Sequence, residues 1–528
     1  MQKSMQSLTT NYLISFSTFK VLRKLYLPML FMLVTFGTTT AENTLLKFIN
    51  IEVSDVKVVH LSTPINDANP IALCVDSTIM QTDTTPPLSE PFAFADFSWI
   101  NGNNRQDTKI FDSKYFSGDA TIDVNYTRSD NNPIDNTVAG STALARNNES
   151  TISYIALGGD FHYNNVRGRF MTQFGTRATV IPRNDYSGYK GQYNLPDAYR
   201  FISEAYGGYH FNYKHGLNID MGIFLSYIGM YSYNNFENWS YQPSYTSDNT
   251  PWFFNGIRVQ FFPTEKTKLE LWVINGWQSY GTFNSMPGIG FSILHRANAN
   301  NSFISNNYYG TDVAGAPNVI RMHTDNSWQH KYYDNQTSSG IKRAAFTLTL
   351  DVGFQSGTYV NGNATDGVGK FTATGDSASN FVSGMVYNRV WFGQGSKWAW
   401  TVGGGFLHNP SRYLSLVPPG GATDKWVAEA TPGSKMDGWD ASTCIDYMPN
   451  QNITLRLEAV HRYMNIPYFN GHGGVSGPGG YQANPANNFN PNSYQPNPYD
   501  PSTKTYANFT PDLVNSENRL IFAIMVRF

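Results

Sequence analysis

The sequence predicts an all-β fold, a transmembrane antiparallel β-barrel of about sixteen strands (14–18), and three observations favour it. Apolar and polar residues alternate with period two along much of the chain, as in strands with two different faces. Short turns and long polar connections alternate between these segments. Charged residues are only 14% of the chain, against about 25% in soluble domains, while aromatic residues reach 15%. Few charges and many aromatic rings suit strands that face lipid.

The N-terminal region has the order of a secretory signal. Lys20, Arg23 and Lys24 precede an apolar run at 25–36, and the small residues of 37–41 follow. The run is too short to cross a bilayer as a helix. We expect residues 1–41 to be a signal peptide cleaved after Ala41; a buried helix is the alternative.

Residues 42–117 are expected to be a periplasmic lead-in that carries a strand or a plug element, with 92–100 as the candidate segment. The barrel is expected over 118–528. Removing residues 1–41 takes four of the 37 basic residues away and leaves 33 against 39 acidic ones, which argues against a nucleic-acid partner. No other stretch is apolar for long enough to predict a membrane helix, and mean hydropathy is −0.37.

Period-two alternation is clearest at 346–354. One face there holds Phe346, Leu348, Leu350, Val352 and Phe354, and the other holds polar or small residues. The same pattern occurs at 217–226, 257–261 and 453–459 and is weakest at 290–296, 302–309 and 319–333. A soluble sandwich also alternates in this way, so one strand alone decides little.

The lengths of the connections distinguish a membrane barrel from a soluble sandwich better than the strands do. Short turns are predicted near 163–165, 214–216, 263–266, 297–301, 334–340, 393–397 and 448–452, and long polar connections at 129–149, 176–198, 230–250, 278–289, 310–318, 356–379, 408–437 and 464–516. Their strict alternation is typical of a barrel with tight periplasmic turns and long extracellular loops. Both ends of the barrel are then expected on the periplasmic side.

The last strand carries an expected assembly signal. Leu520, Phe522, Ile524, Val526 and Phe528 share one wholly apolar face, as a strand facing lipid requires. We expect the terminal aromatic, Phe528, to be recognised by the barrel assembly machinery. Outer-membrane lipid and this machinery are therefore expected partners.

Several stretches resemble the OmpL-like putative β-barrel porin family. They are 256–266 (GIRVQFFPTEK), 273–277 (VINGW), 238–241 (NWSY) and 351–357 (DVGFQSG). The resemblance covers roughly residues 90 to 528 and consists of aromatic and turn patterns. It implies an outer-membrane barrel that acts as a pore, and it assigns no functional residues.

Catalytic and cofactor motifs are absent from the sequence. There is no Gly-x-Ser-x-Gly elbow, His-Glu-x-x-His, P-loop or dinucleotide fingerprint. The two cysteines, Cys74 and Cys444, lie far apart and predict neither a disulfide framework nor a metal site. Arg321, His323, Asp325 and Ser327 share one strand face, but neighbours on a face lie about 6–7 Å apart, too far for a bonded triad. No catalytic, metal or cofactor site is expected.

Charged residues opposite the apolar faces are expected to line the lumen. They are Arg167, Arg169, Glu204, Asp220, Arg258, Glu270, Asp351, Arg389, Asp440, Arg456, Glu458 and Arg519. Each alone fits a hydrated wall residue or a structural ion pair, and the set favours a water-filled interior.

These features predict a porin-like channel in the bacterial outer membrane for passive diffusion of small polar solutes. An outer-membrane barrel enzyme acting on lipid or peptide is one alternative, and a secreted β-rich carbohydrate-binding protein is another. The connection 464–516, rich in Gly, Pro, Asn and Tyr, either folds inward as a constriction or covers the surface. The oligomeric state stays open.

Overall fold

The computed structural model describes residues 89–182, 185, 187, 193–312, 317–356, 379–410, 435–474, 499–500, 505–506 and 512–528. The expected signal peptide and most of the connection 464–516 therefore lie outside the described residues. No helix in the described ranges has the length and hydropathy needed to cross a membrane.

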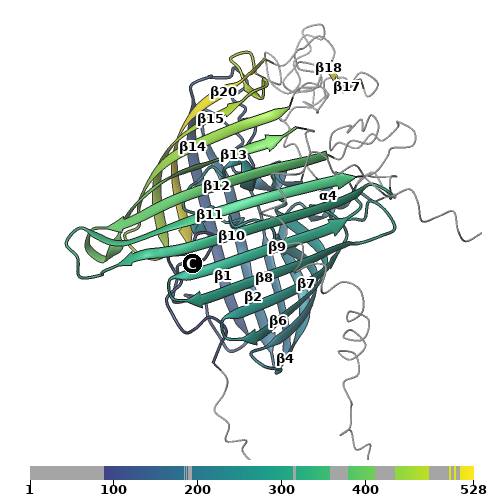
Figure 1. Cartoon of the computed structure of the whole chain (residues 1–528), viewed down its shortest axis with the longest axis vertical. Coiled ribbons are helices and arrows are strands. Elements are labelled where there is room, and N and C mark those ends of the chain that lie inside the picture. The colour runs from purple at the N-terminus through teal and green to yellow at the C-terminus, as the bar shows by residue number, and fades with distance from the viewer. Residues whose placement is uncertain are drawn as a thin grey trace, which may run out of the picture. The chain divides into compact units, whose positions relative to one another are not determined.

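Sixteen antiparallel strands close into one barrel, each paired with the next along the chain, and β20 pairs with β1 (Figure 1). The strands are β1 (Phe116–Ser129), β2 (Ser150–Tyr163), β3 (Val166–Thr172), β4 (Ile202–Phe211), β5 (Leu217–Leu225), β6 (Phe253–Thr264), β7 (Thr267–Ile274), β8 (Gly288–Asn298), β9 (Asn301–Gly310), β10 (Ile320–Asp334), β11 (Ile341–Ser356), β12 (Ser379–Phe392), β13 (Trp398–Asn409), β14 (Met436–Tyr447), β15 (Ile453–Met464) and β20 (Ser516–Arg527). The predicted strand number is confirmed, and the three weakest segments form β8, β9 and β10.

The connections carry only short elements. Helical turns are α3 (Arg177–Val180), α4 (Leu195–Tyr199), η3 (Asn235–Glu237), α5 (Tyr245–Asp248) and η4 (Gln394–Ser396). Two small sheets pair β16 (Phe469–Asn470) with β19 (Leu513–Val514), and β17 (Tyr499–Asp500) with β18 (Thr505–Tyr506).

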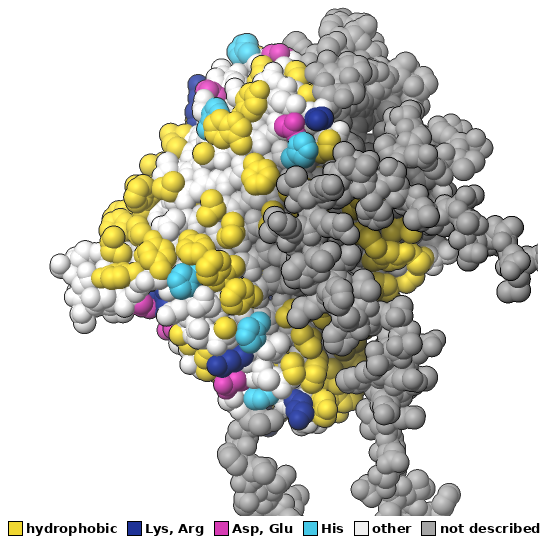
Figure 2. All heavy atoms as spheres, in the orientation of Figure 1, with side chains coloured by type: hydrophobic (Ala, Val, Ile, Leu, Met, Phe, Trp, Pro, Cys, Tyr) yellow, Lys and Arg dark blue, Asp and Glu magenta, His cyan; other side chains and the backbone are white. Residues whose placement is uncertain are grey.

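The alternation of β20 matches its two environments. Leu520, Phe522 and Ile524 are 51%, 46% and 39% exposed, while Ile521 and Met525 are fully buried. The predicted apolar face is therefore the outer face. Figure 2 shows apolar side chains across the middle of the near wall, with charged side chains mainly towards its margins. This distribution is what a lipid-facing wall requires.

Short turns, the start of β1 and the end of β20 lie at one end of the barrel, here called the turn end. Aromatic rings pair on the wall near this end: Tyr115 with Tyr163 (5.7 Å between ring centres), Tyr213 with Phe261 (5.8 Å) and Trp398 with Tyr447 (4.6 Å). Aromatic belts of this kind occur where a barrel wall meets the membrane interface. The long connections lie at the opposite end, the loop end.

A charge on the outer face of β20 is expected to impair insertion. Ile524→Arg places a cation in the apolar band, at a cost of about 2–4 kcal/mol near mid-bilayer. Heat-modifiable gel migration and protease protection should show a smaller folded fraction. Ser516→Arg inserts the same side chain at the exposed loop end of β20 and should assemble normally. Equal assembly of the two variants would mean that the band does not face lipid.

The role of Phe528 in assembly stays a prediction, and the structure makes it separable from strand pairing. The Phe528 backbone exchanges two hydrogen bonds with Ala120 (2.8 and 3.1 Å), and its ring is 40% exposed. If the ring is the signal, Phe528→Ala keeps these bonds but should assemble as poorly as a chain that lacks Phe528, whereas Phe528→Tyr should assemble well. Normal insertion of Phe528→Ala, measured by the same gel assay, would exclude the ring as the signal.

Candidate functional site

One connection between strands and the segment ahead of β1 both fold into the barrel. The first is the connection 226–252 between β5 and β6, here called the inner loop; none of its residues is exposed. The second is the segment 89–106 ahead of β1, here called the strap. The strap includes the candidate plug segment 92–100, which forms turns and no strand. Both segments place their backbone against the inner wall. The side chains of this wall must therefore supply hydrogen-bond partners for the backbone N–H and C=O groups.

Carboxylates of the wall hold the inner loop by its backbone. Glu458 on β15 accepts hydrogen bonds from the N–H groups of Tyr241 and of Gln242, the latter at 3.2 Å. Asp440 on β14 accepts from the Tyr245 N–H at 3.0 Å and from the Ser244 hydroxyl at 2.8 Å. The Tyr245 N–H begins the single turn of α5, where a helix leaves its donors unpaired. The wall therefore fixes the position of the loop.

Arginines of the same wall hold loop carbonyls. Arg456 donates to the Asn238 carbonyl at 2.6 Å, and Arg389 donates to the Trp239 carbonyl at 3.3 Å. Both guanidinium groups also pair with Asp446, each at 2.7 Å. All three charged side chains are almost completely buried. One carboxylate thus orients two arginines towards adjacent carbonyls of the loop.

A second ion pair lies near the loop end of the same wall. Arg462 on β15 lies 2.9 Å from Asp248 of α5, and Asp248 accepts the Thr142 hydroxyl at 2.7 Å. Burial raises the pKa of the Asp248 carboxyl, although Arg462 and Thr142 act to lower it. Arg519 on β20 donates to the Gln242 side chain at 2.6 Å. The inner loop is therefore held along its whole second half.

The strap crosses the turn end of the barrel. Trp99 donates through its indole N–H to the Ala299 carbonyl in the β8–β9 turn at 3.2 Å, and the Asn101 N–H donates to the Gln329 side chain on β10 at 2.9 Å. Further along, Arg105 donates to the carbonyl of Ile453 at the start of β15 at 2.9 Å. Burial lowers the pKa of Arg105 to about 9. The strap therefore spans from one wall to the other.

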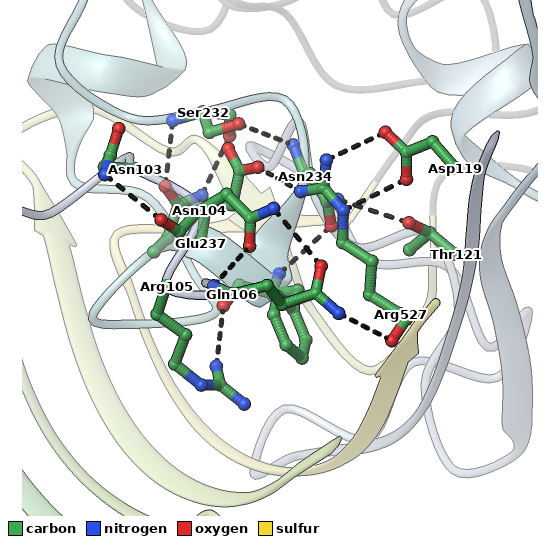
Figure 3. Close-up of polar contacts among 12 residues, drawn as sticks. Asn103, Asn104, Arg105, Gln106, Asp119, Thr121, Ser232, Asn234, Glu237 and Arg527 are labelled. Atoms are coloured by element: carbon green, nitrogen blue, oxygen red, sulfur yellow. Dashed lines mark hydrogen bonds and ion pairs between the residues drawn. The ribbon is translucent and has the colours of Figure 1, made fainter. Parts of the chain in front are cut away.

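Strap and inner loop meet beside the seam between β1 and β20 (Figure 3). The Gly102 N–H donates to the Glu237 carbonyl at 3.1 Å, and Arg105 stacks 3.9 Å above the Phe236 ring. Arg527 on β20 pairs with Asp119 on β1 at 2.8 Å and also with the Glu237 side chain. One arginine therefore connects the seam to the inner loop.

The opposite wall leaves a cavity of about 240 Å³. Strands β6 to β10 form one side of it, and the strap and the start of the inner loop form the other. Its polar lining consists of Asn101, Asn103, Ser226, Arg258, Lys268, Glu270, Ser292, Arg296, Ser302, Asn306 and Gln329. Trp272, Tyr227 and Met230 are among its apolar residues. The inner loop thus fills the lumen beside β12–β15 and β20, and the polar cavity lies beside β6–β10.

The residues expected to line the lumen lie on strands and point away from the outer apolar face, but their contacts differ, and Asp220 pairs with both Arg167 and Arg258. Arg389, Asp440, Arg456, Glu458 and Arg519 contact the inner loop. Arg258 and Glu270 line the cavity. Arg167 joins Asp220 at 3.3 Å, and Arg169 joins Glu204 at 2.6 Å. Asp351 pairs with His323 at 2.6 Å. The structure does not bring them into one ring.

The strand face considered for catalysis has a different geometry from a triad. Ser327 shares a hydrogen bond with Thr349 (2.8 Å), whereas His323 pairs with Asp351 on β11. Within the described residues, no group of three or more His, Cys, Asp or Glu side chains is arranged to hold a metal ion. Cys444 is a buried free thiol on β14.

Several residues of the site were not predicted from the sequence. Arg462 and Arg527 alternate with apolar positions on the same strands as Arg456 and Arg519, so the period-two pattern was the signal that contained them. Arg296 and Lys268 lie near strand ends, where the alternation is weak. No sequence pattern marked the strap residues Asn101 and Arg105.

Removing the Glu458 carboxylate is expected to release the inner loop. Glu458→Ala leaves two buried N–H groups without an acceptor, at about 1–3 kcal/mol each. Single-channel conductance in a planar bilayer should rise, while heat-modifiable migration shows a folded barrel. Glu149→Ala, which removes a half-exposed carboxylate at the loop end, is the control. Unchanged conductance in a folded Glu458→Ala barrel would mean that the loop does not restrict the lumen.

Comparison with known proteins places this geometry in a family. A family model described as "Putative beta-barrel porin-2, OmpL-like" matches residues 115–488. No curated protein sequence matches the chain.

Comparison with solved structures finds outer-membrane proteins at low sequence identity. OmpT of Vibrio cholerae is 8% identical (TM-score 0.42; 79% of this chain and 99% of that chain covered). The outer membrane channel DcaP of Acinetobacter baumannii is 12% identical (TM-score 0.41; 79% and 99% covered). An anion-selective porin from Comamonas acidovorans is 9% identical (TM-score 0.40; 78% and 99% covered).

Proposed function

The chain belongs to the OmpL-like putative beta-barrel porin-2 family and is a porin-like channel of the bacterial outer membrane, and from its inner wall we propose that it passes small polar solutes by passive diffusion. The single observation that carries this proposal is the polar cavity left between β6–β10 and the two inward segments. Charged, amide and hydroxyl groups line the cavity. A polar solute can form hydrogen bonds with them in place of those that it loses when it leaves water.

The inward segments set the size limit in this proposal. A cavity of about 240 Å³ corresponds to about eight water molecules at roughly 30 Å³ each. Side chains of β12, β14, β15 and β20 hold the inner loop in place. Solutes about as large as a triose fit beside it, whereas oligosaccharides do not. The inner loop therefore takes the role of constriction that the sequence analysis considered for 464–516.

The charged residues of the lumen have two roles in this proposal. Arg389, Asp440, Arg456, Glu458 and Arg519 position the inner loop. Arg258 and Glu270 face the solute pathway. Arg167, Arg169, Glu204 and Asp220 line the wall towards the turn end, and Asp351 pairs with His323 on the inner wall. Membrane lipid around the apolar band and the assembly machinery at Phe528 are the proposed partners.

A channel without catalytic activity is the simplest interpretation of the His323 and Ser327 geometry. The Ser327 hydroxyl is engaged with Thr349, and the imidazole is engaged with Asp351, so neither is arranged to activate the other. A barrel hydrolase would need a nucleophile within hydrogen-bond reach of its base.

Reconstitution of the full mature chain tests the proposal. We expect stepwise conductance in a planar bilayer, and rapid swelling of proteoliposomes in glycerol but little in raffinose, because the trisaccharide exceeds the cavity. Liposomes with heat-denatured protein are the control. A folded, inserted barrel that conducts no ions and passes no glycerol would contradict passive diffusion.

A further inference from the structure

The cavity carries more positive than negative charge. Arg258, Lys268 and Arg296 line it, and Glu270 is the one carboxylate among its lining residues. Arg258 pairs with Asp220, whose carboxylate lies 2.7 Å away. Lys268 pairs with Glu270 at 3.0 Å. Arg296 is the cation of the lining that has no carboxylate partner among the described residues.

Arg296 has aromatic neighbours in place of an acidic partner. Its guanidinium lies 4.6 Å from the ring centre of Phe92 and 4.4 Å from that of Phe97, both in the strap. It donates one long hydrogen bond, 3.4 Å, to the Asn103 side chain. Within the described part of the chain, no carboxylate forms an ion pair with it. Ring faces stabilise a cation but leave its N–H edge available.

Unpartnered donors also lie beside Arg296. Arg296 Nε and Ser302 Oγ are buried atoms with no hydrogen-bond partner in the described ranges, and the two residues are paired across β8 and β9. A buried donor without a partner costs about 1–3 kcal/mol, so a group that accepts hydrogen bonds from both is favoured here. A hydroxyl donor beside a cation that lacks a counter-charge matches a carboxylate.

We propose that this cavity is a binding site for a small monocarboxylate, with Arg296 as its charged contact and Ser302 as a further donor. This assignment rests on the proposed function, because it names the class of solute that the lumen retains. The volume of about 240 Å³ suits an acid of a few carbon atoms. A neutral sugar would leave Arg296 without a counter-charge, and a cation would meet the wrong sign.

The strap is part of the site. It contributes Asn101 and the two rings that cover Arg296, while β8 contributes Arg296 and β9 contributes Ser302. The site is therefore assembled only when the strap lies across the turn end. Binding of the carboxylate should in turn stabilise the docked strap, because a ligand favours the state that binds it.

Lactate and glycerol, which are similar in size, provide charged and neutral probes. Equilibrium dialysis of labelled lactate against the folded, detergent-solubilised mature chain should show saturable binding that glycerol does not displace. Arg296→Gln should weaken it at least tenfold, about 1.4 kcal/mol. Arg296→Lys should retain part of it. Arg128→Gln, the same change on the exposed outer face, should leave it unaltered. Gel migration confirms that each variant is folded.

Conductance of the same preparations separates this site from the proposed function. If the barrel conducts and passes glycerol but does not bind lactate, or binds it equally in Arg296→Gln, the carboxylate site is overturned and the channel stands. If Arg296-dependent binding occurs in a barrel that does not conduct, the site stands and passive diffusion fails. Equal binding of glycerol and lactate would also overturn the site, since the charge would then play no part.

Discussion

The pairing of β1 with β20 is the constraint on which the rest of the molecule depends. Nine residue pairs, from Thr121 with Arg527 to Ser129 with Arg519, close the barrel. In lipid, an open sheet edge would leave its N–H and C=O groups without partners, so closure is required for any strand to be stable there. The same two strands present Asp119, Arg519 and Arg527 inward. Closure therefore also creates the anchor for the inner loop and the strap.

The two sides of the lumen use their polar residues differently. On the β12–β15 and β20 side, buried charges are satisfied by one another and by loop backbone, as in the Asp446 group. Buried ion pairs add little net stability, but removing one partner is costly, so they fix position more than they stabilise. On the β6–β10 side, donors outnumber acceptors around the cavity. A rigid clamp on one side thus keeps the opposite side open to solutes.

Much of the barrel followed from the sequence, and the filling of its lumen did not. Strand number, the outer face of β20 and the turn positions depend on local alternation, which the sequence displays directly. The inner loop depends on contacts far apart in sequence, such as Tyr241 with Glu458. Its composition resembles that of the other long connections, so composition gave no reason to prefer it to 464–516. Residues 475–498, the central part of 464–516, lie outside the described residues.

The charged wall residues illustrate the same limit. Alternation placed Arg456 and Glu458 on one face, but it could not distinguish a hydrated wall from a dry clamp. That distinction depends on whether another segment occupies the lumen. Arg296 was not predicted for a related reason. Its guanidinium packs against the rings of Phe92 and Phe97, and these residues lie in the strap, ahead of every strand.

The strap precedes every strand of the barrel, yet its contacts depend on strands from the far end of the chain. Its partners Ala299, Ile453 and Arg527 lie 200, 348 and 421 residues from the strap residues that bind them. Those partners are brought together only when all sixteen strands have joined, so the contacts cannot guide the early steps of assembly. Closure of the barrel therefore has to come before the strap can make its full set of contacts. The turn end is covered only once the wall around it is complete.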